Sequence, residues 1–433
     1  MVKQYLFLVL IFRLTFNLSI ITLPFDNYYF IHNQLNSPNE KFNELLNNFV
    51  RVNISIGDPK QEISLNLTFN SYITYLSGSD VKGGFKKFNE KISKSYNKIE
   101  NKISQFYLEH FVKGIKSTEN FYLLFNGKDE KVINDFNFIL ANELNNLEEM
   151  GQLGLCYGNI YSGNKLENYN FISQLHKKKL IDSYSFTIKY NDLNTGELII
   201  GALPHEYNSR YNKNDFISIK AGNTQEISWS ILFKELRYGN EIFMKNVFIE
   251  FQLELGLIIA SSELKEKLIN DFFNHNPNCH MLKDEERISF YCDNDKGINK
   301  FKDLILTSEV GNFNFVLNYK DLFEKHGEKF YFLIVFPLSD NINTWKLGKP
   351  FLRKFQIVFD QDKKIIGFYT KMSSNNFPII ITFLICLFVI IGLSLFIYVY
   401  VNKNRRKKRN NEIDDGFDYY TTEELNKKPI LGI

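Results

Sequence analysis

Residues 52–78 read Val52-Asn-Ile-Ser-Ile-Gly-Asp-Pro-Lys-Gln-Glu-Ile-Ser-Leu-Asn-Leu-Thr-Phe-Asn-Ser-Tyr-Ile-Thr-Tyr-Leu-Ser-Gly78, and this stretch decides the fold. Apolar residues recur at every second position through Ile63, Leu65, Leu67 and Phe69. Such alternation is typical of a β-strand with one buried face, and Gly-Asp-Pro is typical of a turn. The stretch therefore predicts a strand, a turn and a second strand.

This hairpin resembles the N-terminal lobe of the pepsin-like aspartic proteases. In that family a strand, a Gly-x-Pro-x-Gln turn and a second strand deliver an Asp-Thr-Gly-Ser loop to the active site. Ile56-Gly-Asp-Pro-Lys-Gln61 matches the turn, and counting on without a gap places Thr68-Phe69-Asn70-Ser71 on the loop. Tyr75 then falls on the aromatic position that follows the motif. A threonine, Thr68, therefore stands where the family has its first catalytic aspartate.

The resemblance continues along the chain. Residues 103–114 resemble the flap hairpin that folds over the cleft, with Tyr107 on the flap tyrosine and Leu108-Glu109-His110 in place of the usual Gly-Thr-Gly tip. Further segments match in the family's order: a strand at 133–144, the segment 150–155, a helix at 171–181, hairpin strands at 183–189 and 196–201, a helix at 261–273 and the closing signature 345–368.

The second Asp-Thr-Gly motif is also altered. One register places Gln252-Leu253-Glu254 on the motif, and another places Glu254-Leu255-Gly256 on it. Neither register restores an aspartate, and Lys349 replaces the usual Asp of the closing signature. The resemblance implies that Thr68 and the loop 252–256 meet at the floor of a cleft.

For the fold, the resemblance implies a mostly β, bilobal pepsin-like domain at 40–371, with lobes at about 40–200 and 201–371. It also implies that Tyr107, Thr68, Asn70 and Gly256 line a substrate cleft. We expect the domain to be a monomer.

Two apolar runs mark the ends of the chain. Residues 1–22 have the layout of a signal peptide, and 377–401 form an uncharged run long enough to cross a bilayer as a helix. The basic cluster 403–409 opens the tail 402–433 and assigns it to the cytoplasm. The sequence predicts a single-pass type I membrane protein of the secretory pathway, in a lysosome-like compartment or at the cell surface.

Cysteines and sequons agree with this compartment. Cys279 and Cys292 flank a polar segment and are predicted to form a disulfide, whereas Cys156 is expected to be a buried thiol. Asn53-Ile-Ser and Asn66-Leu-Thr are candidate glycosylation sites. We expect no metal site, since His280 beside the cysteine pair does not complete four zinc ligands.

The composition of the chain and the motifs that it lacks limit the classes of function that are possible. A net charge of +3, from 52 basic and 49 acidic residues, disfavours a nucleic-acid partner. No Gly-rich phosphate loop or Ser/Cys nucleophile elbow is present in the sequence, and no cofactor is expected.

Aspartic proteolysis needs two carboxylates that share a proton. Since Thr68 and either Gln252 or Glu254 replace the aspartates, the sequence predicts an inactive homologue that binds peptide or protein in its cleft. An active membrane-anchored aspartic endopeptidase is the alternative.

Overall fold

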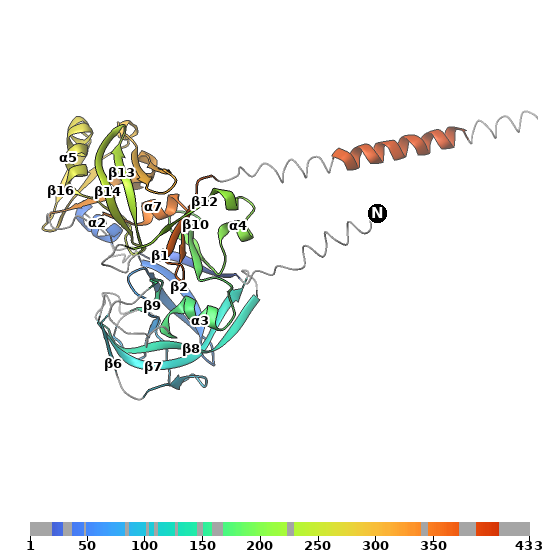
Figure 1. The fold of residues 1–433 in the computed structure, drawn as a ribbon, viewed down its shortest axis with the longest axis horizontal. Helices are drawn as coiled ribbons and strands as arrows, with labels where there is room; N and C mark the ends of the chain where they lie inside the picture. Colours follow the sequence, from blue (N-terminus) through green and yellow to red (C-terminus); the bar gives the residue numbers. More distant parts are fainter. Residues whose placement is uncertain are drawn as a thin grey trace, which may run out of the picture. The chain divides into compact units, whose positions relative to one another are not determined.

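The structure is a computed structural model that describes most of the chain. The described residues are 20–28, 37–46, 49–82, 86–100, 104–107, 111–125, 129–144, 150–157, 168–222, 229–338, 345–371 and 387–406. The chain divides into a large unit, Met1–Met372, and a second unit, Ser373–Ile433. Within its described part the large unit is mostly β and contains two sheets (Figure 1).

The first sheet has 14 strands. Its order is β12 (Phe216–Lys220), β25 (Ile365–Tyr369), β24 (Val358–Asp360), β10 (Ser185–Tyr190), β11 (Thr195–Ile200), β1 (Ile21–Tyr28), β2 (Phe49–Ile56), β3 (Gln61–Thr68), β9 (Gly151–Gly154), β4 (Tyr75–Ser77), β8 (Asp129–Leu144), β7 (Phe111–Phe125) and β5 (Asn97–Lys98). A further strand, β6 (Ser104–Tyr107), pairs with β7.

The predicted hairpin is present as β2 and β3, which run antiparallel with Ile56 opposite Gln61. Alternate residues of β2, including Val52 and Ile54, are buried, as are Leu65 and others of β3. Burying one such aliphatic side chain contributes about 1.5–3 kcal/mol relative to leaving it exposed. The alternation in the sequence thus fixes which face of this hairpin joins the core.

The N-terminal strand β1 lies between β2 and β11 in the first sheet. Ile21 pairs with Ile200, and Thr22 pairs with Ile199. The predicted signal-peptide boundary after residue 22 therefore falls inside a paired strand. Residues 1–19, which make up most of that predicted segment, lie outside the described residues.

The second sheet has 11 strands. Its order is β19 (Asn314–Leu317), β18 (Leu304–Ser308), β13 (Ser230–Tyr238), β14 (Glu241–Phe251), β23 (Trp345–Leu347), β15 (Ile258–Ile259), β22 (Ile334–Pro337), β17 (Arg287–Cys292), β21 (Lys329–Phe332) and β20 (Phe323–His326), with β16 (Cys279–Lys283) paired to β17. The α-helices in the described part of this unit are α2 (Pro38–Leu46), α3 (Phe171–Lys177), α4 (Pro204–Tyr207), α5 (Ser262–Asp271), α6 (Tyr319–Leu322) and α7 (Lys349–Lys354).

The predicted disulfide joins the two strands of the β16–β17 hairpin. Cys279 lies opposite Cys292 in the strand register, and their sulfur atoms are bonded at 2.02 Å. Cys156 is buried, as expected.

The two candidate glycosylation sites lie on adjacent strands. Asn53 of β2 is exposed, and its Oδ1 accepts a hydrogen bond from Ser64. Asn66 of β3 lies between Arg51 of β2 and Gln152 of β9, and its Oδ1 is buried. The side chain of Asn53 is therefore the more accessible of the two.

The second unit contains one described helix, Leu387–Arg406. By length and composition it is able to cross a membrane. The first part of the predicted span, 377–386, and the tail from 407 onward lie outside the described residues.

Candidate active-site region

The site is built at the ends of two strands that have the same surroundings in their respective sheets. β3 pairs in parallel with β9, and β14 pairs in parallel with β23. In these ladders Leu67 lies opposite Leu153, and Phe251 lies opposite Leu347. Leu67 and Phe251 therefore hold equivalent positions in the two sheets.

Thr68 and Gln252 come directly after these two residues. On the partner strands, Gly154 follows Leu153 and Gly348 follows Leu347. Each glycine packs against the loop of its own sheet. A Cβ on Gly154 would lie 2.6 Å from the carbonyl oxygen of Ser71, and one on Gly348 would lie 2.2 Å from that of Leu257 and 2.3 Å from that of Leu255. Ser71 is three residues after Thr68 and Leu255 is three after Gln252, so the glycine contacts give the same alignment. Of the two registers left open by the sequence, the structure supports the one that places Gln252 opposite Thr68.

The two loops meet, as the resemblance implied, and they hydrogen-bond crosswise. The hydroxyl of Thr68 donates to Oε1 of Glu254, and Nδ2 of Asn70 donates to Oε1 of Gln252 at 3.1 Å. Thr68 is equivalent to Gln252, and Asn70 is equivalent to Glu254. Each bond therefore joins the first of these positions in one loop to the second of them in the other loop. The two bonds therefore follow an approximate two-fold relation between the loops.

One oxygen of Glu254 collects several donors of the opposite loop. Besides the Thr68 hydroxyl, the backbone N–H of Phe69 donates to Oε1 at 2.7 Å and that of Asn70 at 3.3 Å. The Asn70 N–H also donates to Oγ1 of Thr68 at 3.0 Å. Charge-assisted bonds of this kind from backbone amides are among the stronger hydrogen bonds in proteins. Thr68 and Gln252 are 2% and 5% exposed, so this junction is largely shielded from water.

Aromatic side chains pack against Phe69 and hold the first loop in place. The ring of Phe69 lies 4.8 Å from that of Phe359 and 6.2 Å from that of Phe186, measured between centroids. Trp229, which packs on both Phe186 and Phe359, donates from Nε1 to the carbonyl of Leu155 at 3.0 Å. These contacts tie the loop to segments from both halves of the chain.

The predicted flap hairpin corresponds to β6 and β7. Tyr107 ends β6 and lies opposite Phe111 of β7. The predicted tip, 108–110, and the side chain of Tyr107 lie outside the described part of the structure. Within that part β6 pairs with β7 alone, so its other edge carries backbone groups that a further strand is able to pair with.

The remaining predicted cleft residue, Gly256, is buried under helix α2. Its N–H donates to the carbonyl of Leu46 at 3.3 Å. Phe42 and Leu45 of α2 are buried in one apolar cluster with Leu257, the residue after this glycine. The helix, which is blue in Figure 1, thus packs on the second sheet beside the site loop.

Helix α2 was not predicted from the sequence, although its start carries a recognisable signal. Ser37 and Glu40 form a capping box: the Glu40 N–H donates to Oγ of Ser37 at 3.3 Å, and the Ser37 N–H donates to Oε2 of Glu40 at 3.1 Å. Pro38 follows at the first helical position, where its missing N–H costs nothing.

Lys349, at the position of the family's closing aspartate, is buried behind the same loop. Lys349 is only 2% exposed, and its backbone N–H donates to the carbonyl of Leu255 at 2.8 Å. Burial lowers the pKa of Lys349 to about 8, although the nearby Glu324 carboxylate acts in the opposite direction.

The partly buried Glu324 is the acidic residue near Lys349. Its carboxylate lies 2.7 Å from Nε2 of His326 and 3.3 Å from Nη1 of Arg353. Burial favours a raised pKa, but the hydrogen bond from His326 and the positive charges of Lys349 and Arg353 outweigh it and lower the pKa to about 2. Glu324 and its three basic neighbours therefore form a charged cluster, in which Lys349 is the member that contacts the second loop.

Neither loop brings a metal-binding set together. Among the described residues, no group of three or more His, Cys, Asp or Glu side chains has an arrangement suited to a metal ion.

Comparison with known proteins agrees with this geometry. The eukaryotic aspartyl protease family matches residues 51–371, which is well over half of the chain. The chain belongs to this family. Basic 7S globulin from soybean, known from its crystal structure, matches with a TM-score of 0.60 at 11% sequence identity, and the match covers 82% of this chain and 96% of that one. The mostly β, bilobal pepsin-like fold is thereby confirmed. No curated protein matches the chain.

Proposed function

We propose that this chain is a membrane-anchored member of the family that does not hydrolyse peptide bonds and that binds peptide or protein between its lobes. One observation carries the first part of the proposal. The equivalent positions at the ends of β3 and β14 hold Thr68 and Gln252, and neither side chain is an acid.

The chemistry explains why these two residues matter. An aspartic protease uses two carboxyl groups that share a proton, so that one activates water while the other protonates the peptide carbonyl. A hydroxyl and an amide form hydrogen bonds but do not exchange protons in this way near neutral or acid pH. Glu254 is two residues further on, and its Oε1 is engaged by Thr68, Phe69 and Asn70.

Peptide binding is supported by the unpaired edge of β6 in the described structure. An extended peptide is able to add to such an edge through main-chain hydrogen bonds, while pockets for alternate side chains give selectivity. This mode of binding needs no carboxylate pair, so it is compatible with the loss of the aspartates.

Membrane anchoring is supported by the helix Leu387–Arg406 and by the basic residues at its C-terminal end. Positive residues favour the cytoplasmic side, which puts the large unit in the lumen or outside the cell. The Cys279–Cys292 disulfide agrees with an oxidising compartment.

The test is a digestion assay at acid pH with a reduced and alkylated protein as substrate. The full chain, its Glu254→Ala variant and an active family member are run in parallel, with and without a statine inhibitor. We expect no inhibitor-sensitive cleavage by the full chain, while binding of labelled peptides from the same substrate is detected by fluorescence anisotropy.

Two outcomes would contradict the proposal. Inhibitor-sensitive cleavage that disappears in Glu254→Ala would make Glu254 catalytic. It would favour the alternative function, an active endopeptidase, which is supported by the presence of the Glu254 carboxylate at the junction of the two loops. Absence of peptide binding by folded protein, checked by near-UV circular dichroism, would remove the binding part.

A further inference from the structure

A groove lies at the C-terminal end of α2, where the helix meets the second sheet. Its apolar walls come from Leu46 of α2, Ile259 of β15, Val335 and Pro337 of β22, and Leu338. Its volume is about 410 Å³, which is within the range of ligand-binding pockets. The groove starts near the site, because the carbonyl of Leu46 accepts the hydrogen bond from Gly256.

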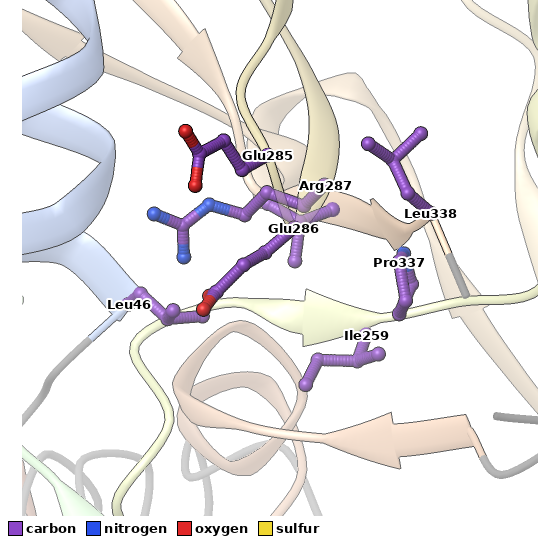
Figure 2. A pocket seen from close by; sticks show the side chains of 8 residues that line it. Leu46, Ile259, Glu285, Glu286, Arg287, Pro337 and Leu338 are labelled. Carbon is purple, nitrogen blue, oxygen red and sulfur yellow. The ribbon is translucent and has the colours of Figure 1, made fainter.

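Charged side chains form one rim of this groove. Glu285 and Glu286 precede β17 and Arg287 begins it, and their side chains lie across from Pro337 and Leu338, with Glu286 reaching toward Leu46 (Figure 2). The guanidinium of Arg287 is already engaged: its Nε donates to Oδ2 of Asp284 at 3.0 Å, and Nη2 donates to Oδ1 of Asn43 on α2. Its positive charge is therefore compensated within the protein.

The two glutamates are in a different situation. Both are exposed, and neither forms an ion pair with another residue of the described chain. The rim thus presents two uncompensated negative charges above an apolar floor.

We propose that this groove binds an arginine or lysine side chain of an extended polypeptide. The apolar walls suit the methylene stem of such a residue, since long basic side chains bury their stems and keep the charge near polar groups. The carboxylates of Glu285 and Glu286 attract the cationic end. A purely apolar side chain would form no ion pair with either glutamate, and an acidic side chain would be repelled by both.

The inference rests on the proposed function and adds a residue preference to it. The groove is formed only while α2 is docked, because Leu46 supplies one wall. Selectivity for a basic residue is therefore coupled to the helix that packs beside Gly256.

The experiment compares two blocked heptapeptides, acetyl-Thr-Val-Leu-Arg-Phe-Val-Thr-amide and its counterpart with citrulline, which has the shape of arginine without the charge. Binding to the full chain in detergent is measured by ligand-observed NMR at low and high salt. We expect the arginine peptide to bind about fivefold tighter, as a partly exposed ion pair allows, and we expect salt to reduce this ratio.

The matched variants separate the groove from the overall charge. In Glu285→Gln/Glu286→Gln the arginine preference should disappear, whereas Glu263→Gln/Glu309→Gln, which removes two exposed carboxylates elsewhere, should retain it. Equal binding of both peptides to the parent, an unchanged preference in the first variant, or no binding at all overturns the inference. Mass spectrometry of the recovered peptides keeps the two proposals distinguishable, since cleavage counts against the proposed function and intact peptides without a preference count against the groove alone.

Discussion

The hydroxyl of Thr68 donates a hydrogen bond to the carboxylate of Glu254, and this contact joins the end of β3 to the loop that follows β14. The acid reaches across the junction between the two loops and satisfies donors of the opposite one. The first prediction follows from this arrangement.

Replacing Glu254 with alanine should lower the free energy of unfolding by about 1–3 kcal/mol, because it removes the acceptor of the Thr68 hydroxyl and of the N–H groups of Phe69 and Asn70. Chemical denaturation of the full chain in detergent measures the change. Glu263→Ala, an exposed acid on α5, is the control. Equal stability of the two variants would show that the Glu254 bonds add nothing to the junction.

Lys349 should make stability rise with pH in the alkaline range. Its pKa is about 8 in the folded protein against 10.5 as the ordinary value. Between these values the unfolded chain binds the proton and the folded chain does not, so unfolding becomes less favourable as pH increases. The full gap corresponds to about 3 kcal/mol.

In the Lys349→Met variant this rise should be absent. Unfolding midpoints between pH 7.5 and about 9 test the prediction, since tyrosines, with an ordinary pKa of about 10, begin to titrate above that range. Lys220→Met, which removes an exposed lysine on β12, should retain the slope of the parent. A parent curve without a rise over this interval contradicts the prediction.

Truncating Phe42 should loosen α2. This side chain is 1% exposed and packs edge-on against Tyr331 with ring centroids 5.2 Å apart. Phe42→Ala leaves a cavity that costs about 3–5 kcal/mol if the helix stays docked, and the helix separates if docking is weaker than that. Hydrogen–deuterium exchange should therefore become faster in 38–46.

Exchange should also accelerate at Gly256, whose N–H donates to Leu46. Asn39→Ala changes an exposed residue of the same helix and is expected to leave both regions unchanged. Unaltered protection of Gly256 in Phe42→Ala would mean that this amide is protected independently of α2.

If the large unit enters the secretory pathway, a glycan is expected on Asn53 rather than on Asn66. Asn53 is exposed, whereas Asn66 is flanked by paired strands on both sides and has a buried Oδ1. A glycosidase-sensitive mass shift should disappear in Asn53→Gln and persist in Asn66→Gln. The reverse pattern would contradict the strand register, and absence of any shift would count against lumenal exposure of this hairpin.

The sequence was most informative where the pattern is local. The hairpin of β2 and β3 follows from alternating apolar residues and a Gly-Asp-Pro turn, and the pair Cys279 and Cys292 follows from a short loop in a domain that is predicted to be exported. Thr68 was placed by counting from the turn without a gap. Each of these depends on neighbours within a few residues.

The second loop was harder to place because its register depends on distant residues. Gln252 and Glu254 are two positions apart, so both fit an alternating pattern equally well. Their alignment is decided by β23, in which Leu347 lies opposite Phe251. The docking of α2 on Leu257 also depends on tertiary packing, and the crosswise bonds depend on how the two loops meet.

The order of strands in the first sheet has a consequence for how the protein acquires its structure. β1 begins at Ile21, and β25, which pairs with β24 and β12, ends at Tyr369. The sheet is therefore not complete until nearly the whole large unit has been synthesised. Pairing between such distant segments slows folding, because the chain loses entropy before the contacts form. β1 is able to pair early with β2 but must wait for β11, which is made much later, and a chaperone that shields its free edge during translation would raise the yield of folded protein.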